Sequence, residues 1–470
     1  MFPSLTRSLV SKAAPLYPIV SRNPALGTVI QRFSFDSKNV IDKTLSTAQE
    51  GFEKFSSLSI KERGDLLKNL ANVLESRIDK LAELATVEMG KPIVESEAEV
   101  KKCAWVLRHF AETSEAFLKP VPVETDAQDS HIVYQPLGVV FGIFPWNFPF
   151  WQVYRAIAPS MMVGNVYIMR HAQNVPMCAL AIEETFKLAG FPDGALQNSF
   201  CSIPTLHEML EDPRVKATSL TGSVGAGASL AAKAGSVLKK AVLELGGSDP
   251  FIVLKDADLE LAVDNAVAGR LLNSGQSCIA AKRFIVEKDI LKPFTEAFVE
   301  KMGRVKIGNP MSRSVRVGPI ARKDLMLGLH DQVLRSIEQG AKVLIGGTPM
   351  NRKGFFYPVT VLTDVNEENT AFTEELFGPV APIIVAQDAD DAVRLANKSD
   401  FGLGSSVFTK DIEKGKEIAL RLEAGQAFVN NFVKSDPRLP FGGVKKSGYG
   451  RECSQHALFE FANVKTIWVK

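Results

Sequence analysis

The segment at residues 273–283, NSGQSCIAAKR, places Cys278 after a glycine and a glutamine in an otherwise apolar stretch. A thiolate there could act as a nucleophile, but a free cysteine is more often a small buried hydrophobe. The chain has five cysteines, an odd number without CxxC spacing, which predicts a reducing compartment, no disulfide framework and no bound metal. Cys278 therefore needs support from other residues before a reaction can be assigned to it.

Three other segments contain groups that could assist a thiol. LELGGSDP places Glu244 at the end of an expected strand, where α/β sheets carry catalytic groups; a water-facing edge glutamate is the alternative. FPWNFP contains Asn147, whose amide could donate to an oxyanion or satisfy a turn. LTGSVGAG contains Gly222 and Ser223 between an expected strand and an expected helix, so it could bind a diphosphate or be only a tight turn.

The elements around these groups have to position them. From residue 138, short β-branched runs alternate with helical stretches, which indicates parallel strands, right-handed crossovers and a doubly wound sheet. A second series of the same kind begins at residue 250 and continues through residues 380 and 405, which predicts a second α/β domain. Upstream, Ser59 and Glu62 have the Ser-x-x-Glu spacing that predicts a capped helix start. The predicted fold class is α/β.

Bulk composition limits the classes of function. A length of 470 residues predicts two or three domains, and 46% hydrophobic residues can fill their cores. The formal net charge is +2 with both signs interspersed, which predicts no nucleic-acid partner. The most apolar region, residues 138–151, is broken by two prolines and is too short for a spanning helix. We interpret it as core and predict no membrane partner.

The amino terminus contains basic residues and serines, and no acidic residue before Asp36. Leu5, Leu9 and Ala13 recur one helical turn apart, which is typical of an amphipathic mitochondrial targeting segment at residues 1–16. The alternative is an ordinary basic terminus, for which a cytoplasmic location is expected.

Six segments, taken in order, resemble the signature segments of the NAD(P)-dependent aldehyde dehydrogenase superfamily: FPWNFP, LTGSVGAG, LELGGSDP, NSGQSC, EELFGPV and PFGGVKKSGYGRE. The resemblance covers the chain from about residue 17 to its end. It implies that Cys278 attacks an aldehyde, that Asn147 and the Cys278 backbone N–H hold the oxyanion, and that Glu244 activates the water that hydrolyses the thioester. An acyl-transfer enzyme that uses coenzyme A and a catalytically silent protein on the same scaffold are alternatives. The presence of Glu244 argues against the first, and the presence of Cys278, Asn147 and Glu244 together disfavours the second.

The resemblance also implies NAD or NADP as the cofactor. Ser223 matches a pyrophosphate contact, and Glu375 and Phe377 match positions that hold the nicotinamide ribose and ring. The family often has a lysine and, three residues later, a glutamate that bind the adenosine ribose; these places hold Arg170 and Gln173 here. Loss of the acid and gain of an arginine favour tolerance of the 2′-phosphate of NADP. The expected cofactor-binding residues are Trp146, Arg170, Gln173, Gly222, Ser223, Glu375 and Phe377.

The segments around Trp151, Arg155 and Ser435 resemble the succinate-semialdehyde dehydrogenase branch, which implies that these residues bind a substrate carboxylate. An arginine suits a planar carboxylate, and a solvated or interface arginine is the alternative reading of Arg155. Leu272 occupies the place of a second arginine found in some members, so one arginine is expected to hold the carboxylate. Other short semialdehydes are therefore alternative substrates. Ala280 replaces a second cysteine of some members, so no local disulfide switch is expected.

The domain organisation implied by the resemblance has three parts. A doubly wound parallel-sheet cofactor domain is expected at residues 17–117 and 138–246, and a second α/β catalytic domain at residues 247–446. A β oligomerisation element is expected at residues 118–137 and 447–470. Its β-rich segments leave open sheet edges that need a partner strand, so a homodimer or homotetramer is expected.

Overall fold

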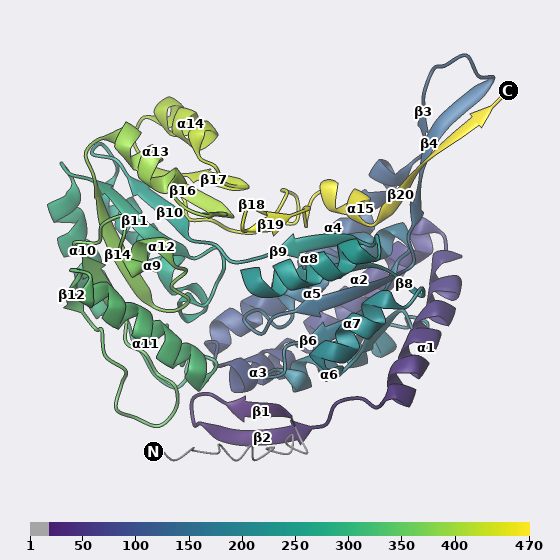
Figure 1. The fold of residues 1–470 in the computed structure, drawn as a ribbon, viewed down its shortest axis with the longest axis horizontal. Helices are drawn as coiled ribbons and strands as arrows, with labels where there is room; N and C mark the ends of the chain where they lie inside the picture. The colour runs from purple at the N-terminus through teal and green to yellow at the C-terminus, as the bar shows by residue number, and fades with distance from the viewer. Residues whose placement is uncertain (1–17) are drawn as a thin grey trace, which may run out of the picture.

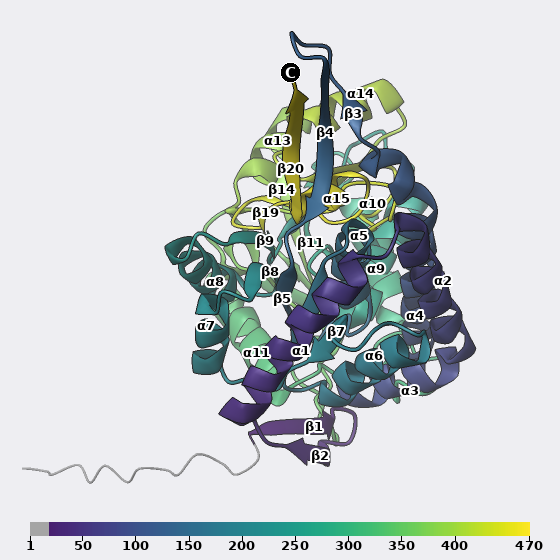
Figure 2. The same cartoon turned by 90° about the vertical axis from the view of Figure 1, so that its right-hand side faces the viewer.

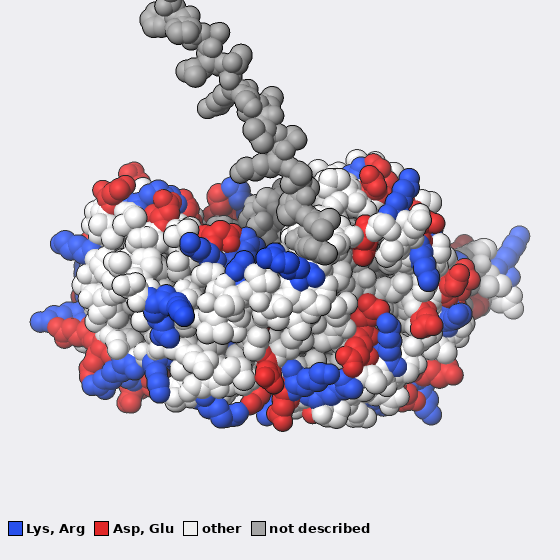
Figure 3. Space-filling view, turned by 90° about the horizontal axis from the view of Figure 1, so that it is seen from below, with Lys and Arg blue, Asp and Glu red and all other residues white. Residues whose placement is uncertain are grey.

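The computed structural model describes residues 18–470, so the possible targeting segment at residues 1–16 lies outside the described residues. The fold is α/β: two bodies, each with its own sheet, make up most of the molecule, and a narrow β arm extends from one side (Figures 1 and 2). Basic and acidic side chains are intermixed on the face seen in Figure 3. Among the helices of residues 18–470, none is long and apolar enough to cross a membrane.

The first sheet has six strands, of which five are parallel and one, at an edge, is antiparallel. In spatial order they are β19 (Gly448–Tyr449), β9 (Lys240–Glu244), β8 (Val215–Thr221), β5 (Val139–Phe144), β6 (Val166–His171) and β7 (Leu196–Asn198). The chain builds β5, β6 and β7 in one direction and then returns to add β8 and β9 on the other side of β5. The order of the strands therefore reverses between β5 and β8, as in a doubly wound sheet.

Every residue of β5 is buried, as expected for a strand covered on both faces. This strand, with the loop after it, is the apolar region at residues 138–151, so its interpretation as core is confirmed. The helices that connect the parallel strands are α5 (Trp151–Val163), α6 (Pro176–Leu188), α7 (Ile203–Glu211) and α8 (Val224–Ser236).

The second sheet follows directly after β9, through Gly246 and Gly247, and is parallel apart from the pair at one edge. Its strands are, in spatial order, β12 (Lys342–Ile345), β13 (Thr360–Thr363), β14 (Val380–Ala386), β11 (Ala281–Glu287), β10 (Asp249–Val253), β16 (Gly404–Phe408) and β17 (Gln426–Val429). Its helices are α9 (Leu259–Leu271), α10 (Leu291–Gly303), α11 (Lys323–Glu338), α12 (Thr370–Thr373), α13 (Ala389–Asn397) and α14 (Ile412–Arg421). The predicted second α/β series is confirmed.

Four helices precede the first sheet and cover it. They are α1 (Lys38–Ser56), α2 (Ile60–Ser76), α3 (Ile78–Met89) and α4 (Ile93–Leu118), after an antiparallel hairpin of β1 (Ile19–Asn23) and β2 (Thr28–Phe33). The predicted capping box is confirmed: the Ser59 side chain accepts from the backbone N–H of Glu62, and the Glu62 side chain accepts from that of Ser59. The amphipathic pattern gives helices because each buries its leucine face against this sheet or a neighbouring helix.

The arm is a three-stranded antiparallel sheet of β3 (Val121–Pro122), β4 (Asp129–Pro136) and β20 (Ala462–Val469). It follows α4, and α15 (His456–Glu460) leads into its last strand. A small antiparallel pair is formed by β15 (Phe401–Gly402) and β18 (Val444–Lys445). It joins the segment before β16 of the second sheet to the segment before β19 of the first sheet. The chain after residue 446 thus contributes strands to two sheets: β19 pairs with β9 of the first sheet, and β20 then pairs with β4 in the arm.

The backbone of the loop before β7 lies very close to the backbone of α1 at Gly194. Gly194 has φ +88°, and a Cβ there would lie 2.0 Å from the Thr47 carbonyl oxygen of α1. Gly194→Ala should therefore lower the free energy of unfolding by about 1–3 kcal/mol beyond the cost of a left-handed alanine, because the helix has to move. Gly190→Ala is the control, since Gly190 has φ +85° and nothing within 4 Å of the added carbon. Equal losses of melting temperature in the two variants would contradict the close approach.

Candidate active site

The carboxyl ends of β5 and β8 meet at the point where the strand order reverses, and two of the motifs follow these strands directly. Trp146 and Asn147 come after β5, and Gly222 and Ser223 come after β8. Because β5 and β8 are parallel neighbours, the two loops open on the same edge of the sheet. Such a crevice is where open α/β sheets bind their ligands.

The first turn of α8 offers the groups that a diphosphate needs. Ser223 is the N-cap, and its side chain accepts from the Ala226 backbone N–H at 3.4 Å. The first N–H groups of a helix lack intrahelical acceptors, and the positive end of the helix dipole attracts anions. Gly225 is exposed with open space around it, so a ligand can reach the backbone. These features fit the phosphates of a dinucleotide.

The loop between α9 and β11 contains Cys278 and is called the nucleophile loop. It approaches this crevice from the second body, and part of it has a left-handed backbone. Asn273, Ser274 and Gly275 have φ of 55°, 57° and 77°, so three consecutive residues are left-handed. Hydrogen bonds hold them there: Glu95 accepts from the Asn273 N–H at 2.6 Å, and Arg270 donates to the Gly275 carbonyl at 2.7 Å.

Asn147 is joined to this loop across the boundary between the two bodies. Its Nδ2 donates to the Gln276 carbonyl at 3.0 Å, and Asn273 Nδ2 donates to the Asn147 carbonyl at 2.6 Å. Gln152 donates to Asn147 Oδ1 at 3.1 Å, which fixes the orientation of the amide. The amide nitrogen carries two hydrogens, so one is still free to donate to a ligand. Asn147 thus lies beside the backbone that leads to Cys278.

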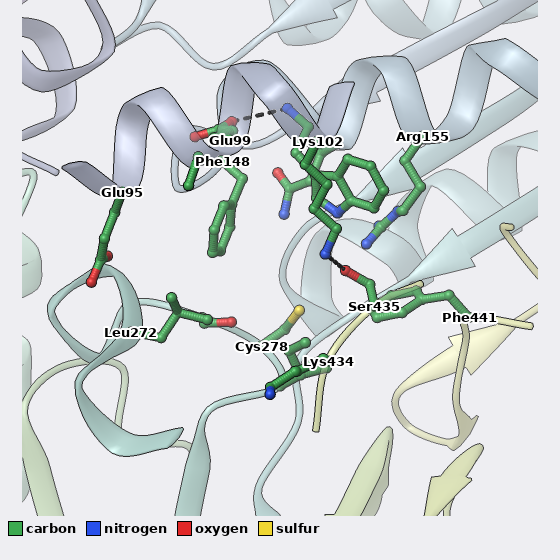
Figure 4. Close-up of a pocket in the computed structure, with 15 residues that line it drawn as sticks. Glu95, Glu99, Lys102, Phe148, Arg155, Leu272, Cys278, Lys434, Ser435 and Phe441 are labelled. Atoms are coloured by element: carbon green, nitrogen blue, oxygen red, sulfur yellow. Dashed lines mark hydrogen bonds between the residues drawn. The ribbon is translucent and has the colours of Figure 1, made fainter. Parts of the chain in front are cut away.

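Cys278 opens into a cavity of about 160 Å³ (Figure 4). This volume is below the roughly 300–1,000 Å³ of pockets for drug-sized ligands, so the site suits a short molecule. Burial raises the pKa of the Cys278 thiol to about 12, while the nearby charges of Arg155 and Lys282 act in the opposite direction. The residues that line the cavity are Glu95, Ala98, Glu99, Lys102, Phe148, Trp151, Gln152, Arg155, Leu272, Ser277, Cys278, Ile279, Lys434, Ser435 and Phe441.

Glu244 ends β9 and is buried, and neither of its carboxyl oxygens has a hydrogen-bond partner within residues 18–470. Burial, followed by the adjacent Glu452 carboxyl, raises the pKa of Glu244 well above its usual range. A raised pKa makes the carboxylate a stronger base, which is a property that water activation requires. Arg155 lies within electrostatic reach of both Glu244 and Cys278.

Arg155 lines the cavity as expected, together with Trp151 and Ser435, but its charge is already balanced. Its Nε donates to the buried carboxylate of Glu452, and its guanidinium lies 4.1 Å from the centre of the Phe441 ring. Its Nη2 has no hydrogen-bond partner in the described part of the chain. Arg155 therefore retains the N–H groups of Nη2 for a ligand, while its charge is balanced by Glu452.

The expected nicotinamide-binding residues lie next to the nucleophile loop. Glu375 accepts from the Gly247 N–H at 3.1 Å and forms an ion pair of 3.1 Å with Lys282, whose Nζ also donates to the Cys278 carbonyl at 2.6 Å. Phe377 meets the Trp146 ring edge-on, with centroids 5.8 Å apart. A carboxylate suits a ribose, and the two rings suit a flat aromatic ring.

The expected adenosine-binding residues lie at the carboxyl end of β6: Arg170 is the next-to-last residue of the strand, and Gln173 follows the strand. Arg170 is half-buried, and its Nε donates to the Cys201 carbonyl at 3.1 Å, which orients the guanidinium. Gln173 is exposed and lines a surface hollow that Arg22 and Arg322 also border. Both residues sit at the same edge of the first sheet as Ser223.

Several site residues escaped the sequence analysis. Lys102 reaches the cavity from α4, Gln276 and Asn273 connect the loops, and Glu452 neutralises Arg155. Glu452 is part of the quoted segment PFGGVKKSGYGRE, so its position could have been noticed there. Lys102 carried no comparable signal, because it is one of two adjacent lysines on a long helix that also carries several other charged residues.

Comparisons with known proteins agree with this geometry. The family model described as "Aldehyde dehydrogenase family" matches residues 11–467. The Escherichia coli protein named succinate semialdehyde dehydrogenase [NAD(P)+] Sad is 46% identical over 454 residues, which cover 97% of this chain and 98% of that protein. Succinate-semialdehyde dehydrogenase [NADP(+)] 1 of Mycobacterium bovis is 43% identical over 455 residues, covering 96% of this chain and 100% of that protein.

A solved structure of succinic semialdehyde dehydrogenase from Streptococcus pyogenes, in complex with NADP+, is also similar. It has a TM-score of 0.94 and 34% sequence identity, and the match covers 96% of this chain and 99% of that chain. The similarity to these proteins extends over nearly the whole length of the chain. The chain belongs to the aldehyde dehydrogenase family.

Proposed function

We propose that this protein oxidises succinate semialdehyde to succinate with NADP+ or NAD+, through a thioester on Cys278. The observation that carries the proposal is a small cavity in which the Cys278 thiol faces aromatic walls, an arginine and a serine. Such a cavity matches a short aldehyde that ends in a carboxylate. The names of the Escherichia coli and Mycobacterium bovis relatives state the same substrate, and they state NAD(P)+ or NADP(+).

The reaction begins with attack of the Cys278 sulfur on the aldehyde carbon. The thiol has to lose its proton in this step, because burial keeps the pKa of Cys278 at about 12 in the ligand-free protein. The proton passes to solvent, in the wild type by way of the Glu244 carboxylate. The S–C bond forms as the carbonyl π bond opens, and the oxyanion accepts hydrogen bonds from Asn147 Nδ2 and the Cys278 backbone N–H. A nicotinamide held by Trp146 and Phe377 would supply the hydride acceptor, and loss of the hydride from the former aldehyde carbon would leave a thioester on Cys278.

The second half of the reaction is hydrolysis of the thioester. Glu244 takes a proton from a water molecule, the water oxygen bonds to the acyl carbon, and the C–S bond breaks. The acid leaves and Cys278 is regenerated as a thiol. Because the pKa of Glu244 is raised, we expect more of Glu244 to be in the basic carboxylate form as the pH rises.

The proposal for the cofactor site rests on the hydrogen-bonding groups and aromatic rings that surround the crevice. The first turn of α8 with Ser223 would hold the diphosphate, Glu375 the nicotinamide ribose, and Trp146 and Phe377 would flank the ring. Arg170 would face a 2′-phosphate, and Gln173 brings no opposing charge. We therefore expect NADP+ to be used at least as well as NAD+.

Glu244→Gln gives a test of the two half-reactions. We expect one turnover of reduced nicotinamide per active site in stopped-flow absorbance, followed by steady turnover at least about 100-fold slower than in the wild type. Cys278→Ala is the matched control, and should give no burst while still binding the cofactor. Wild-type steady turnover in either variant would refute the proposed roles.

Gln173→Glu tests the adenosine end of the site. A carboxylate near the 2′-phosphate adds a like-charge repulsion of about 1–2 kcal/mol, so kcat/KM for NADP+ should fall roughly 5- to 30-fold. The value for NAD+ should change less, because its ribose carries a hydroxyl that a carboxylate can accept from. Equal changes for both cofactors, measured by steady-state kinetics, would show that Gln173 lies away from the phosphate.

The substrate is tested by comparing succinate semialdehyde with butanal, which has the same number of carbons and no charge. We expect kcat/KM of the wild type to be at least about tenfold higher for succinate semialdehyde, since a hydrogen bond to a charged group is worth about 1.5–3 kcal/mol. Equal values would leave the family assignment intact and remove the proposed substrate.

The domain roles follow from the same argument. Residues 17–117 and 138–246 would form the cofactor domain, residues 247–446 the catalytic domain, and residues 118–137 and 447–470 the oligomerisation element. The arm leaves β20 at a sheet edge with Val464, Trp468 and Val469 exposed. A neighbouring copy would cover this edge, so we expect a homodimer or homotetramer by light scattering at micromolar concentration; a monomer would contradict it.

A mitochondrial location remains a hypothesis about residues 1–16 alone. The relatives compared here by sequence are bacterial and give it no support. A fluorescent fusion of residues 1–16 that fails to reach mitochondria in eukaryotic cells would remove it.

A further inference from the structure

The cavity contains a cation that the proposed function has not yet used. Lys102 extends from α4 into the cavity toward Ser435 (Figure 4). Its Nζ donates to Ser435 Oγ at 2.7 Å and lies 4.5 Å from the centre of the Trp151 ring. Burial lowers the pKa of Lys102 to about 8, and the nearby charge of Arg155 adds to this effect. The ammonium form therefore still predominates at neutral pH.

Lys102 differs from three other cations near the cavity. Arg155 is paired with Glu452, Lys91 with Glu99, and Lys282 with Glu375. Within residues 18–470, no carboxylate lies within 4.0 Å of Lys102 Nζ. Asp436, the nearest acid along the chain from Ser435, is paired with Arg438. A partly desolvated ammonium group without a counter-ion is poised to receive an anion.

The two acids of α4 that line the cavity cannot supply that anion. Glu99 is occupied by Lys91 and by the backbone N–H groups of Phe150 and Trp151 at the start of α5. Glu95 is occupied by Arg316 and by the Asn273 N–H. Both carboxylates are held by other groups, so the cation in the cavity stays available to a ligand.

We propose that Lys102 is a substrate-specificity residue whose ammonium group, with Ser435 Oγ and the free Nη2 of Arg155, binds the distal carboxylate of the aldehyde substrate. This inference rests on the proposed function and names a further residue for it. The remaining cavity wall suits the methylene groups of a short chain, because Phe148, Leu272 and Ile279 are apolar. The carboxylate would supply the negative charge that Lys102 lacks, whereas Arg155 already has Glu452.

Lys102→Met tests the proposal, because methionine has a similar length and no charge. We expect the ratio of kcat/KM for succinate semialdehyde to that for butanal to fall roughly 10- to 100-fold, as a rise in KM. Lys102→Arg should keep most of the ratio, since it restores a cation that can donate to a carboxylate. The methionine variant should fold, because removing a desolvated charge relieves the cost of burying it. If it does not, Lys102→Gln is measured in the same way.

Two control variants make the test specific. Lys101→Met removes an exposed charge one residue away on the same helix, and should leave the ratio unchanged. Lys434→Met removes the exposed cation that also lines the cavity, and should lower the ratio less than Lys102→Met does. A larger effect at Lys434 would place the carboxylate at the mouth and overturn the proposal.

Failure of this inference and failure of the proposed function give different results. If the wild type does not prefer succinate semialdehyde over butanal, the proposed substrate is wrong. If the wild type does prefer it, but Lys102→Met keeps the wild-type ratio or loses both activities equally, then Lys102 does not bind the carboxylate and the proposed function stands.

Discussion

Three consecutive left-handed residues at positions 273–275 set the position of the reactive thiol. Only Gly275 adopts this conformation without steric cost, so Asn273 and Ser274 need contacts that hold them. Two of those contacts come from distant parts of the chain, Glu95 and the loop at Gly318, and a local one comes from Arg270 at the end of α9. The result is a rigid turn that brings Cys278 to the carboxyl edge of the first sheet.

The same turn unites the two bodies. Asn147 lies in the loop after β5 of the first sheet, and Asn273 and Gln276 lie in the loop before β11 of the second sheet. The hydrogen bonds that link these two loops are buried. A buried amide that loses its partner costs about 1–3 kcal/mol, so the two loops are strongly favoured to stay together. The amide that is proposed to hold the oxyanion is thus also a structural link, and its orientation is fixed before any ligand arrives.

Charge pairing gives the cavity its chemical character. Buried cations are costly unless they are paired, and three of those around the site have a carboxylate partner. Within residues 18–470, the Glu244 carboxyl has no hydrogen-bond partner, and its raised pKa suits a base. Lys102 donates to Ser435, and no carboxylate of the described residues pairs with it. The proposals assign contact with reactants to both groups.

The sequence by itself determined what depends on local pattern and motif order. Alternating strands and helices predicted the two parallel sheets, because burial on both faces requires apolar strands. The Ser59 capping box was readable because its partners are three residues apart. Cys278, Asn147 and Glu244 could be named in advance, because each belongs to a short segment with a characteristic order along the chain.

Only the tertiary structure decided how distant charges pair. Arg155 and Glu452 are 297 residues apart, and Lys102 and Ser435 are 333 residues apart, so no local pattern links them. From the sequence, Arg155 appeared as the single cation for a carboxylate, whereas the fold neutralises it and brings Lys102 into the same cavity. Such pairings depend on which helix faces meet after packing, and the free energy of burying a charge is known only once its neighbours are in place.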